Sequence, residues 1–242
     1  TSEGLDVEVV SGGELYTALQ AGVSGGRIHF QGNNKSSKEL ELAIDNDVGD
    51  IVVDNFSELE KLNKIAGEKG AIANISLRVK PGIDAHTHEF IRTGQVDSKF
   101  GLDLESGEAF SAAKRALRMD NVKLIGLHCH IGSQVMEKEP FVHAAEVMLG
   151  LHHRIYKELE VELEQLNLGG GFGIHYLETD DFIPYHEYMQ EVSAKISEVC
   201  AKYGIKLPRI CIEPGRSIVG EAGITLYTVG NIKEIPHVRN YV

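Results

Sequence analysis

Residues 164–173 read EQLNLGGGFG, a strand-forming run that ends directly in a cluster of glycines. Residues 208–217 read PRICIEPGRS and have the same organisation, because an apolar run leads at once into Pro214 and Gly215. Short apolar runs bounded by glycine or proline are typical of strands buried in a parallel sheet. The two stretches therefore predict parallel strands whose carboxyl ends continue into polar, glycine-containing turns.

Strand-like segments alternate with amphipathic helical ones along the whole chain, which is the pattern of parallel βαβ units, and we find seven such units. The predicted strands are 7–10, 27–31, 50–53, 74–79, 122–128, 164–168 and 208–213. The predicted helices are 13–21, 36–46, 56–69, 105–118, 139–160 and 184–203. Ser36 and Ser57 are expected to cap their helices or to stand in the first turn.

This alternation predicts the α/β class, in the form of an incomplete, TIM-like (β/α)8 barrel. A closed barrel needs eight strands and about 250 residues, so seven units leave the count one strand short. An open, doubly wound sheet is the alternative, because it requires no eighth strand. From residue 223 the chain alternates apolar and polar residues like a half-exposed strand. We therefore expect a barrel domain over 1–222, with its first strand missing, and an exit segment over 223–242.

The composition favours a small molecule as the partner of this chain. A net charge of −12 and a pI near 5.4 argue against nucleic acid or an anionic membrane surface, because like charges repel. Cys129, Cys200 and Cys211 form no CxxC pair, which argues against a disulfide framework and favours the reducing cytoplasm. No apolar run reaches the roughly 20 residues of a membrane span.

Small and polar residues follow three of the predicted strands, at the positions where parallel α/β folds form their sites. They are HCHIGSQ at 128–134, the glycines at 169–171 and EPGRS at 213–217. Glycine lets backbone N–H groups approach a phosphate closely, while Ser133 and Arg216 can donate hydrogen bonds to it. A glycine triplet alone indicates a tight turn about as readily, but two such strand ends and an arginine favour a phosphate site.

Glu213 indicates which phosphate compound the site would take. A carboxylate beside an arginine repels a bare phosphate, yet it suits a cofactor with a cation at one end and a phosphate at the other. Pyridoxal 5'-phosphate has this shape, and a carboxylate at its ring nitrogen keeps the ring an effective electron sink. The alternatives are a salt bridge between Glu213 and Arg216 and, for His130, an ordinary core position in place of stacking on the ring.

Six motifs distributed over nearly the whole chain carry a family resemblance. They are VVSGGEL at 9–15, HFQGNNKS at 29–36, DSKFGL at 97–102, HCHIGSQ at 128–134, NLGGGFGI at 167–174 and EPGRS at 213–217. Together they resemble the diaminopimelate decarboxylases, pyridoxal-phosphate enzymes of the fold-type III, alanine-racemase-like barrel class. The family reaction removes one carboxylate from meso-2,6-diaminopimelate and gives L-lysine, a step of lysine biosynthesis, in a homodimer.

The resemblance implies a role for each matching residue. Glu213 and His130 would be the catalytic residues, the first pairing with the pyridine nitrogen and the second stacking on the ring. The phosphate would be held by Ser133, Gly170, Gly171, Gly215 and Arg216. Arg216 would also reach a substrate carboxylate, and Glu8 stands where the family usually has an aspartate close to the cofactor. Lys99 resembles a residue near the dimer interface, or is a solvated surface lysine.

The family also needs a lysine that holds the cofactor covalently at the end of the first barrel strand. Its Tyr-Ala-(Leu/Val)-Lys-Ala-like motif does not occur in these 242 residues. Lys35 and Lys80 follow predicted strands without matching that position, and the Pro81-Gly82 that follows Lys80 predicts a turn. We therefore expect a fragment without the first βα unit and the C-terminal β-domain, which is inactive by itself.

Three alternatives remain open at this stage. The substrate could be another basic compound, such as ornithine, arginine or carboxynorspermidine. The HxH pairs at 128–130 and 86–88, with Asp54 and Glu213 at strand ends, would suit a metal-dependent barrel hydrolase, although we assign no metal ligand. The chain could also be a noncatalytic binding module with the pyridoxal-phosphate fold.

Overall fold

The computed structural model of the protein describes residues 3–83, 99–176 and 183–242. Its centre is one sheet in which every pairing is parallel. The strands, in spatial order, are β1 (Val7–Val9), β2 (Ile28–Phe30), β3 (Asp50–Val53), β4 (Ala73–Lys80), β6 (Val122–His128), β7 (Gln165–Asn167) and β8 (Arg209–Cys211). The two-residue strand β5 (Leu102–Asp103) pairs with the end of β4 and was not predicted.

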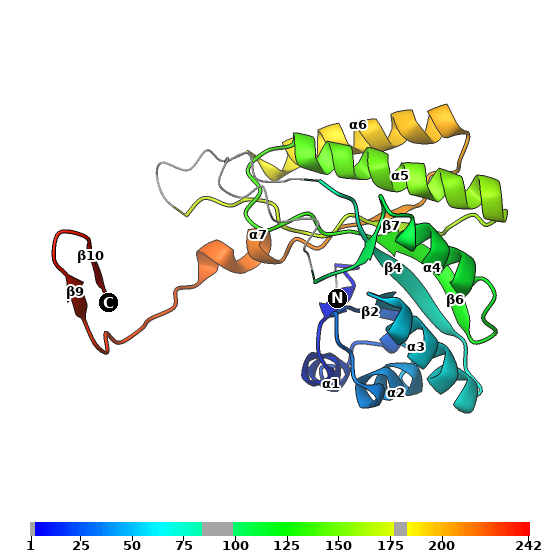
Figure 1. Ribbon diagram of the computed structural model, residues 1–242, viewed down its shortest axis with the longest axis horizontal. Helices are drawn as coiled ribbons and strands as arrows, with labels where there is room; N and C mark the ends of the chain where they lie inside the picture. The colour runs from blue at the N-terminus through cyan, green and yellow to red at the C-terminus, as the bar shows by residue number, and fades with distance from the viewer. Residues whose placement is uncertain (1–2, 84–98, 177–182) are drawn as a thin grey trace.

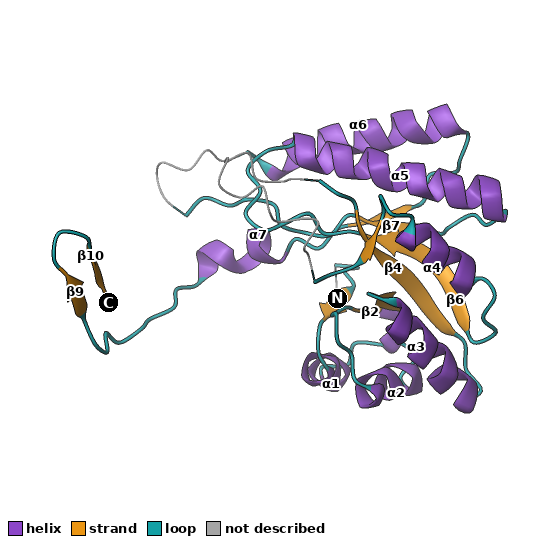
Figure 2. Cartoon of the chain, viewed as in Figure 1, coloured by secondary structure: helices purple, strands orange, loops and turns teal. Residues whose placement is uncertain are grey.

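Helices follow the strands one by one along the chain and lie around the outer side of the curved sheet (Figures 1 and 2). They are α1 (Gly12–Gln20), α2 (Ser37–Asp45), α3 (Phe56–Glu68), α4 (Glu108–Ala116), α5 (Glu139–Leu159), α6 (Tyr185–Tyr203) and α7 (Gly215–Val219), with short 3-10 turns at Gly25–Arg27 and Gly220–Ala222. All six predicted helices are confirmed, with ends that differ by up to three residues. None of the helices in the described ranges has the length and apolarity needed to cross a membrane.

The hydrophobic core lies between the sheet and the helices, because successive side chains of a strand point to opposite faces. In β4, Ile75, Leu77 and Val79 are buried in the core. Ser76 and Arg78 stand on the other face, where Ser76 Oγ donates to Asp50 Oδ2 at 2.9 Å. The inner side of the sheet is therefore polar, and it can bind a polar ligand at its open end.

The order of the strands decides between the two folds that the sequence left open. A doubly wound sheet reverses its strand order at a switch point, whereas this sheet runs in simple chain order. Side chains next to the first two strands also meet those of the last strand region, since Arg209 pairs with Asp6, just before β1, and Gln31, just after β2, donates to Glu213. The sheet is therefore curled into an incomplete barrel, as the sequence predicts, with no backbone pairing between β1 and β8 among the described residues.

Side-chain caps start three of the helices, and at α1 the Ser11 hydroxyl accepts from the Glu14 N–H. Ser36 caps α2, because its hydroxyl accepts from the Glu39 N–H while the Glu39 carboxylate accepts from the Ser36 N–H. In α3 the cap is Asn55, whose side chain accepts from the Glu58 N–H at 2.9 Å. Ser57 lies in the first turn of α3, which was the second of the two positions predicted for it.

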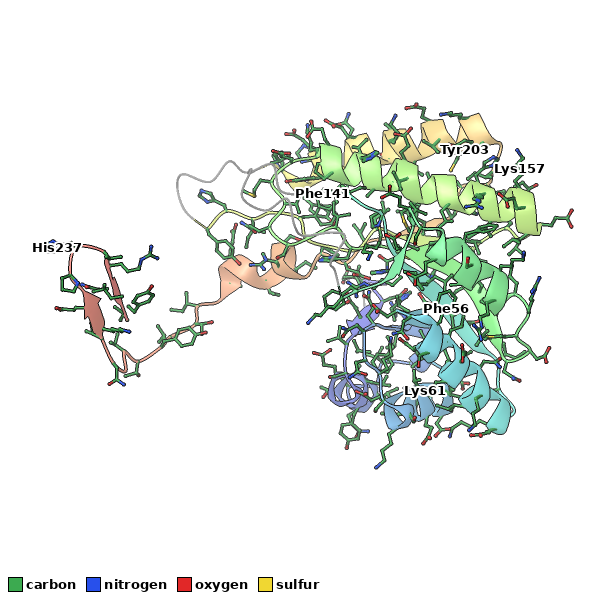
Figure 3. All side chains as sticks on the ribbon, in the orientation of Figure 1. Phe56, Lys61, Phe141, Lys157, Tyr203 and His237 are labelled. Atoms are coloured by element: carbon green, nitrogen blue, oxygen red, sulfur yellow. The ribbon has the colours of Figure 1, made fainter. Side chains whose placement is uncertain are left out.

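The prediction of a strand from residue 223 is wrong. Residues 224–232 form no helix or strand, and the next element is a hairpin of β9 (Lys233–Ile235) and β10 (Arg239–Tyr241). Ile224, Leu226 and Tyr227 are 85–89% exposed. Alternating residues become a strand only where a neighbouring strand accepts their hydrogen bonds, and this segment runs away from the barrel toward the hairpin that carries His237 (Figures 1 and 3).

Candidate active site

A cavity of about 970 Å³ opens at the carboxyl ends of the strands, inside the curled sheet. The structure brings all eight residues predicted to bind the cofactor into its wall: Glu8, His130, Ser133, Gly170, Gly171, Glu213, Gly215 and Arg216. They come from the first strand and from the turns after β6, β7 and β8. The cavity is therefore assembled from segments more than two hundred residues apart in the chain, from Glu8 to Arg216.

Glu213 forms the anionic end of this cavity. Its Oε1 accepts hydrogen bonds from Asn167 Nδ2 at 2.7 Å and from Gln31 Nε2, and His128 Nε2 lies 3.3 Å away. Burial by itself would raise the pKa of Glu213, but His128 and the Asn167 hydrogen bond outweigh it and lower the pKa to about 2. Glu213 is therefore ionised at neutral pH, and it is held in one orientation.

Arg216 and Ser133 form the opposite, cationic end. Arg216 Nη2 donates to Ser133 Oγ at 2.8 Å, and Nη1 donates to the Tyr176 hydroxyl at 2.5 Å. The alternative reading of Glu213, a salt bridge to Arg216, is wrong, because Arg216 bonds Ser133 and Tyr176 and Glu213 bonds other partners. The two charges are thus kept apart, as a cofactor with opposite charges at its two ends requires.

The glycines bring the strand ends into close contact. A Cβ on Gly170 would lie 2.0 Å from the Glu213 carbonyl oxygen, and one on Gly171 would lie 1.9 Å from that of Gly132. Gly171 also has a φ of +96°, which favours glycine. From the sequence, a tight turn and a ligand site were alternatives for these glycines. In the structure the same glycines form a tight turn and also line the cavity.

His130 presents a neutral ring to the cavity. Its Nδ1 accepts from the Gly170 N–H at 3.4 Å, so the ring proton belongs on Nε2. Burial and the positive charge of Arg78 lower the pKa of His130 below its ordinary value. A neutral, flat imidazole is suited to packing against an aromatic ring.

Glu8 lies beside Glu213 in the wall of the same cavity. Burial and the charge of Glu213 raise the pKa of Glu8 to about 8, although Arg78 and His29 act in the opposite direction. Glu8 therefore holds a proton at neutral pH while Glu213 does not. The two carboxyl groups interact directly, and the ionised Glu213 favours the protonated form of Glu8.

The sequence did not identify Arg78, Gln31 and Asn167, which are also parts of the site. Arg78 lines the cavity, with its Nε 4.0 Å from Asp54 Oδ1 and its guanidinium 4.6 Å from the Phe100 ring centre. Each of the three is a polar residue at an inward position of a strand or directly after one. The alternation of apolar and polar residues along the strand could have identified Arg78. In ISLRVK the apolar residues face the core, so the arginine must face the other side of the sheet.

The two lysines that follow predicted strands have different surroundings. Lys35 Nζ is buried, with a side chain 1% exposed, and donates to Gly32 O at 2.7 Å, Val52 O at 2.7 Å and Glu58 Oε1 at 2.6 Å. Its three protons are therefore all engaged. Lys80 was predicted in a turn, which is wrong, because it is the last residue of β4 and it lines the cavity.

The histidines proposed for a metal site have other partners. His128 faces Glu213 and His130 faces Gly170, while His86 and His88 lie outside the described residues. Among the residues that the structure describes, no cluster of three or more histidine, cysteine or acidic side chains is placed to hold a metal. The donor set instead fits pyridoxal phosphate, with a carboxylate for the ring nitrogen at one end and Arg216 and Ser133 for a phosphate at the other.

Comparison with known proteins agrees with this fit. The family described as "Pyridoxal-dependent decarboxylase, pyridoxal binding domain" matches residues 1–220. The chain is 52% identical to diaminopimelate decarboxylase from Bacillus methanolicus over 240 residues, 99% of this chain and 56% of the relative. For the diaminopimelate decarboxylase from Bacillus subtilis (strain 168), the identity is 48% over 247 residues, which cover 99% of this chain and 55% of the relative. The chain thus spans about half the length of the curated relatives it matches.

A solved structure extends the comparison to the fold. The crystal structure of the diaminopimelate decarboxylase from M. jannaschii superposes with a TM-score of 0.82 at 38% identity, over 97% of this chain and 54% of that one. The predicted resemblance, the incomplete barrel and pyridoxal phosphate as cofactor are thereby confirmed. Because the family match covers nearly all of its residues, the chain belongs to the pyridoxal-dependent decarboxylases and contains their pyridoxal binding domain.

Proposed function

We propose that this chain forms the cofactor-binding part of a decarboxylase that converts meso-2,6-diaminopimelate to L-lysine and carbon dioxide in lysine biosynthesis. The observation that carries the proposal is the two-ended cavity, with ionised Glu213 at one end and Arg216 with Ser133 at the other. The relatives that share about half of its residues are named diaminopimelate decarboxylases, which supports the substrate.

Each wall residue has a part in this proposal. When bound, pyridoxal phosphate supplies an electron sink for the pair left at the substrate carbon. Glu213, held by Asn167 and Gln31, keeps the ring nitrogen charged, and His130 packs against the ring. The phosphate is bound by Ser133, Gly170, Gly171, Gly215 and Arg216. Arg216 also meets a substrate carboxylate.

The proposal extends to domains and assembly. Residues 1–222 form the barrel domain, and 223–242 form an exit segment toward a β-domain. The active protein is a cytoplasmic homodimer, with Lys99 near the contact between subunits. Arg216 lies close to the start of the exit segment, so a domain that follows it would stand next to the cavity.

The chain by itself is proposed to bind pyridoxal phosphate weakly and without a covalent bond, because no lysine matches the family position. The test is reduction with borohydride in the presence of pyridoxal phosphate, followed by mass spectrometry of peptides. We expect no stoichiometric adduct. A stoichiometric adduct on Lys80, which lines the cavity, would contradict this part of the proposal.

The substrate is tested on the protein expressed from the complete reading frame. Release of carbon dioxide is measured with meso-diaminopimelate, lysine, ornithine, arginine and carboxynorspermidine at equal concentrations. We expect diaminopimelate to give the highest kcat/KM. Preference for another of these substrates would replace the proposed activity, and inactivity toward all of them would favour a noncatalytic binding module.

A further inference from the structure

Arg216 is held at both ends of its guanidinium by hydroxyl groups. Nη2 donates to Ser133 Oγ at 2.8 Å and Nη1 donates to the Tyr176 hydroxyl at 2.5 Å. The guanidinium carbon also lies 5.7 Å from the centre of the Tyr176 ring. The three residues follow three neighbouring strands, β6, β7 and β8, so this cluster joins three strand ends.

Tyr176 differs from its two partners in its position. Arg216 and Ser133 line the cavity, whereas Tyr176 is not part of its wall. The tyrosine is therefore connected to the cavity through its hydrogen bond to Arg216. Its contact with Arg216 includes a charge-assisted hydrogen bond, which favours one orientation of the guanidinium.

The backbone that carries Tyr176 is tied to the turn that carries Ser133. Gln134 Nε2 donates to Ile174 O at 2.6 Å, and the Ile174 N–H donates to Gln134 Oε1 at 3.2 Å. The Gly173 N–H also donates to Val135 O at 2.9 Å. The residues just before Tyr176 and those just after Ser133 are therefore fixed relative to each other.

Fixing Arg216 in advance has a physical benefit for anion binding. Arginine loses much rotamer freedom when it binds, and affinity rises when that loss has already occurred in the free protein. Ser133 Oγ accepts from Arg216, so the serine hydroxyl proton can be donated to an anion. The guanidinium and the serine hydroxyl thus face the same space.

We propose that Tyr176 is a positioning residue of the phosphate end, which orients Arg216 so that its guanidinium and Ser133 meet the phosphate together. The proposal rests on the function proposed above. It assigns to Tyr176 no contact with the cofactor, and it concerns only the part of the binding energy that comes from the phosphate.

The test compares pyridoxal phosphate with pyridoxal, which lacks the phosphate. Dissociation constants for both are measured by ligand-induced fluorescence quenching on the wild-type chain, Tyr176→Phe and Tyr176→Ala. The control is Tyr16→Phe, because Tyr16 on α1 is 59% exposed and Tyr176 is 53% exposed. Thermal unfolding of each variant confirms that it is folded.

We expect Tyr176→Phe to weaken the binding of pyridoxal phosphate by about three- to tenfold, because the less restrained Arg216 then loses more rotamer freedom when it binds the phosphate, and to leave pyridoxal binding within about twofold. Tyr176→Ala, which also removes the ring, weakens it further, and Tyr16→Phe has no effect. An equal loss for both ligands would overturn the proposal, since Tyr176 would then have a general structural role. The proposal would also be overturned if the ratio of the dissociation constants of pyridoxal and pyridoxal phosphate were the same in Tyr176→Phe as in the wild-type chain.

The same measurement separates this proposal from the proposed function. If the wild-type chain shows no preference for pyridoxal phosphate over pyridoxal, the phosphate site itself is wrong and the role of Tyr176 falls with it. If the preference is present and Tyr176→Phe keeps it, only the positioning role is wrong.

Discussion

The polar neighbours of Glu213 stabilise its ionised carboxylate more than its protonated form. Asn167 and Gln31 donate to the same carboxylate oxygen, and His128 lies beside it. The resulting pKa of about 2 lies below the ordinary value of 4.5. Because the folded-state pKa is lowered, Glu213 contributes stability that is present above about pH 4.5 and is lost as the pH falls toward 2.

The substitution Glu213→Gln tests this ionisation. We expect the free energy of unfolding at pH 7 to fall by about 1–3 kcal/mol, because the variant loses hydrogen bonds to a charged group. The difference from wild type should shrink as the pH falls below 4.5, in urea unfolding measured from pH 7 to pH 3. Glu41→Gln, at an exposed position of α2, is the control. A difference that is the same at every pH would show that Glu213 is not ionised in the way proposed.

At the scale of single residues, the sequence predicted which residues line the cavity but not which of them contact one another. The eight predicted residues share one cavity because each stands on β1 or directly after β6, β7 or β8. Gln31, Arg78 and Asn167 were missed, since their meeting with Glu213 and His130 depends on how far the sheet curls. No rule of spacing gives that curvature.

At the scale of elements, Lys35 and Glu58 join the turn after β2 to β3 and α3. Lys35 Nζ bonds the backbone of Gly32 and Val52 as well as Glu58, and both side chains are almost fully buried. Burial lowers the pKa of Lys35 and raises that of Glu58, and the attraction between the two charges opposes both shifts. Removing one charge would leave the other buried and unpaired.

We therefore expect Lys35→Met to lower the free energy of unfolding by about 3–5 kcal/mol. The double variant Lys35→Met with Glu58→Leu should recover much of this loss, because neither charge is then buried alone. Lys69→Met removes an exposed pair with Asp45 and should cost less than about 1 kcal/mol. The free energies of unfolding of the wild type and the three variants are measured by chemical denaturation. A double variant less stable than Lys35→Met would contradict the view that an unpaired buried charge causes the loss.

The elements themselves were predictable because each has a strong local signal. Ser36 with Glu39 starts α2, and the apolar alternation of β4 determines which face meets the helices. The segment from 223 shows the limit of such signals. It alternates as a strand does, but a strand also needs a partner, and sequence pattern alone does not supply one.

At the scale of the whole molecule, the barrel and the exit segment differ in packing. The barrel has a continuous core between the sheet and the helices. Beyond α7, the large apolar side chains from Ile224 to Val242 are exposed except for the half-buried Ile235, and the chain extends away from the barrel (Figure 1). Exposed, extended backbone is the preferred substrate of proteases.

We expect limited proteolysis to cut first within 224–238 and to leave the barrel folded. The barrel product should keep its cooperative thermal unfolding and bind pyridoxal phosphate within about twofold of the uncut chain, since the cavity is lined by residues up to Arg216. Mass spectrometry locates the cuts. Loss of cooperative unfolding after the first cut would show that the exit segment is part of the barrel domain.

The sequence by itself determined the class of fold, the order of the strands along the chain and the identity of the residues at their carboxyl ends. These follow from local rules, because periodicity, glycine and capping residues act within a few positions. Only the tertiary structure decided which of those residues touch: Glu213 bonds Asn167 and Gln31 and not Arg216, Arg216 bonds Ser133 and Tyr176, and Lys35 turns to Glu58. Such contacts join segments far apart in the chain, and they depend on the curvature of the sheet and the packing of its helices.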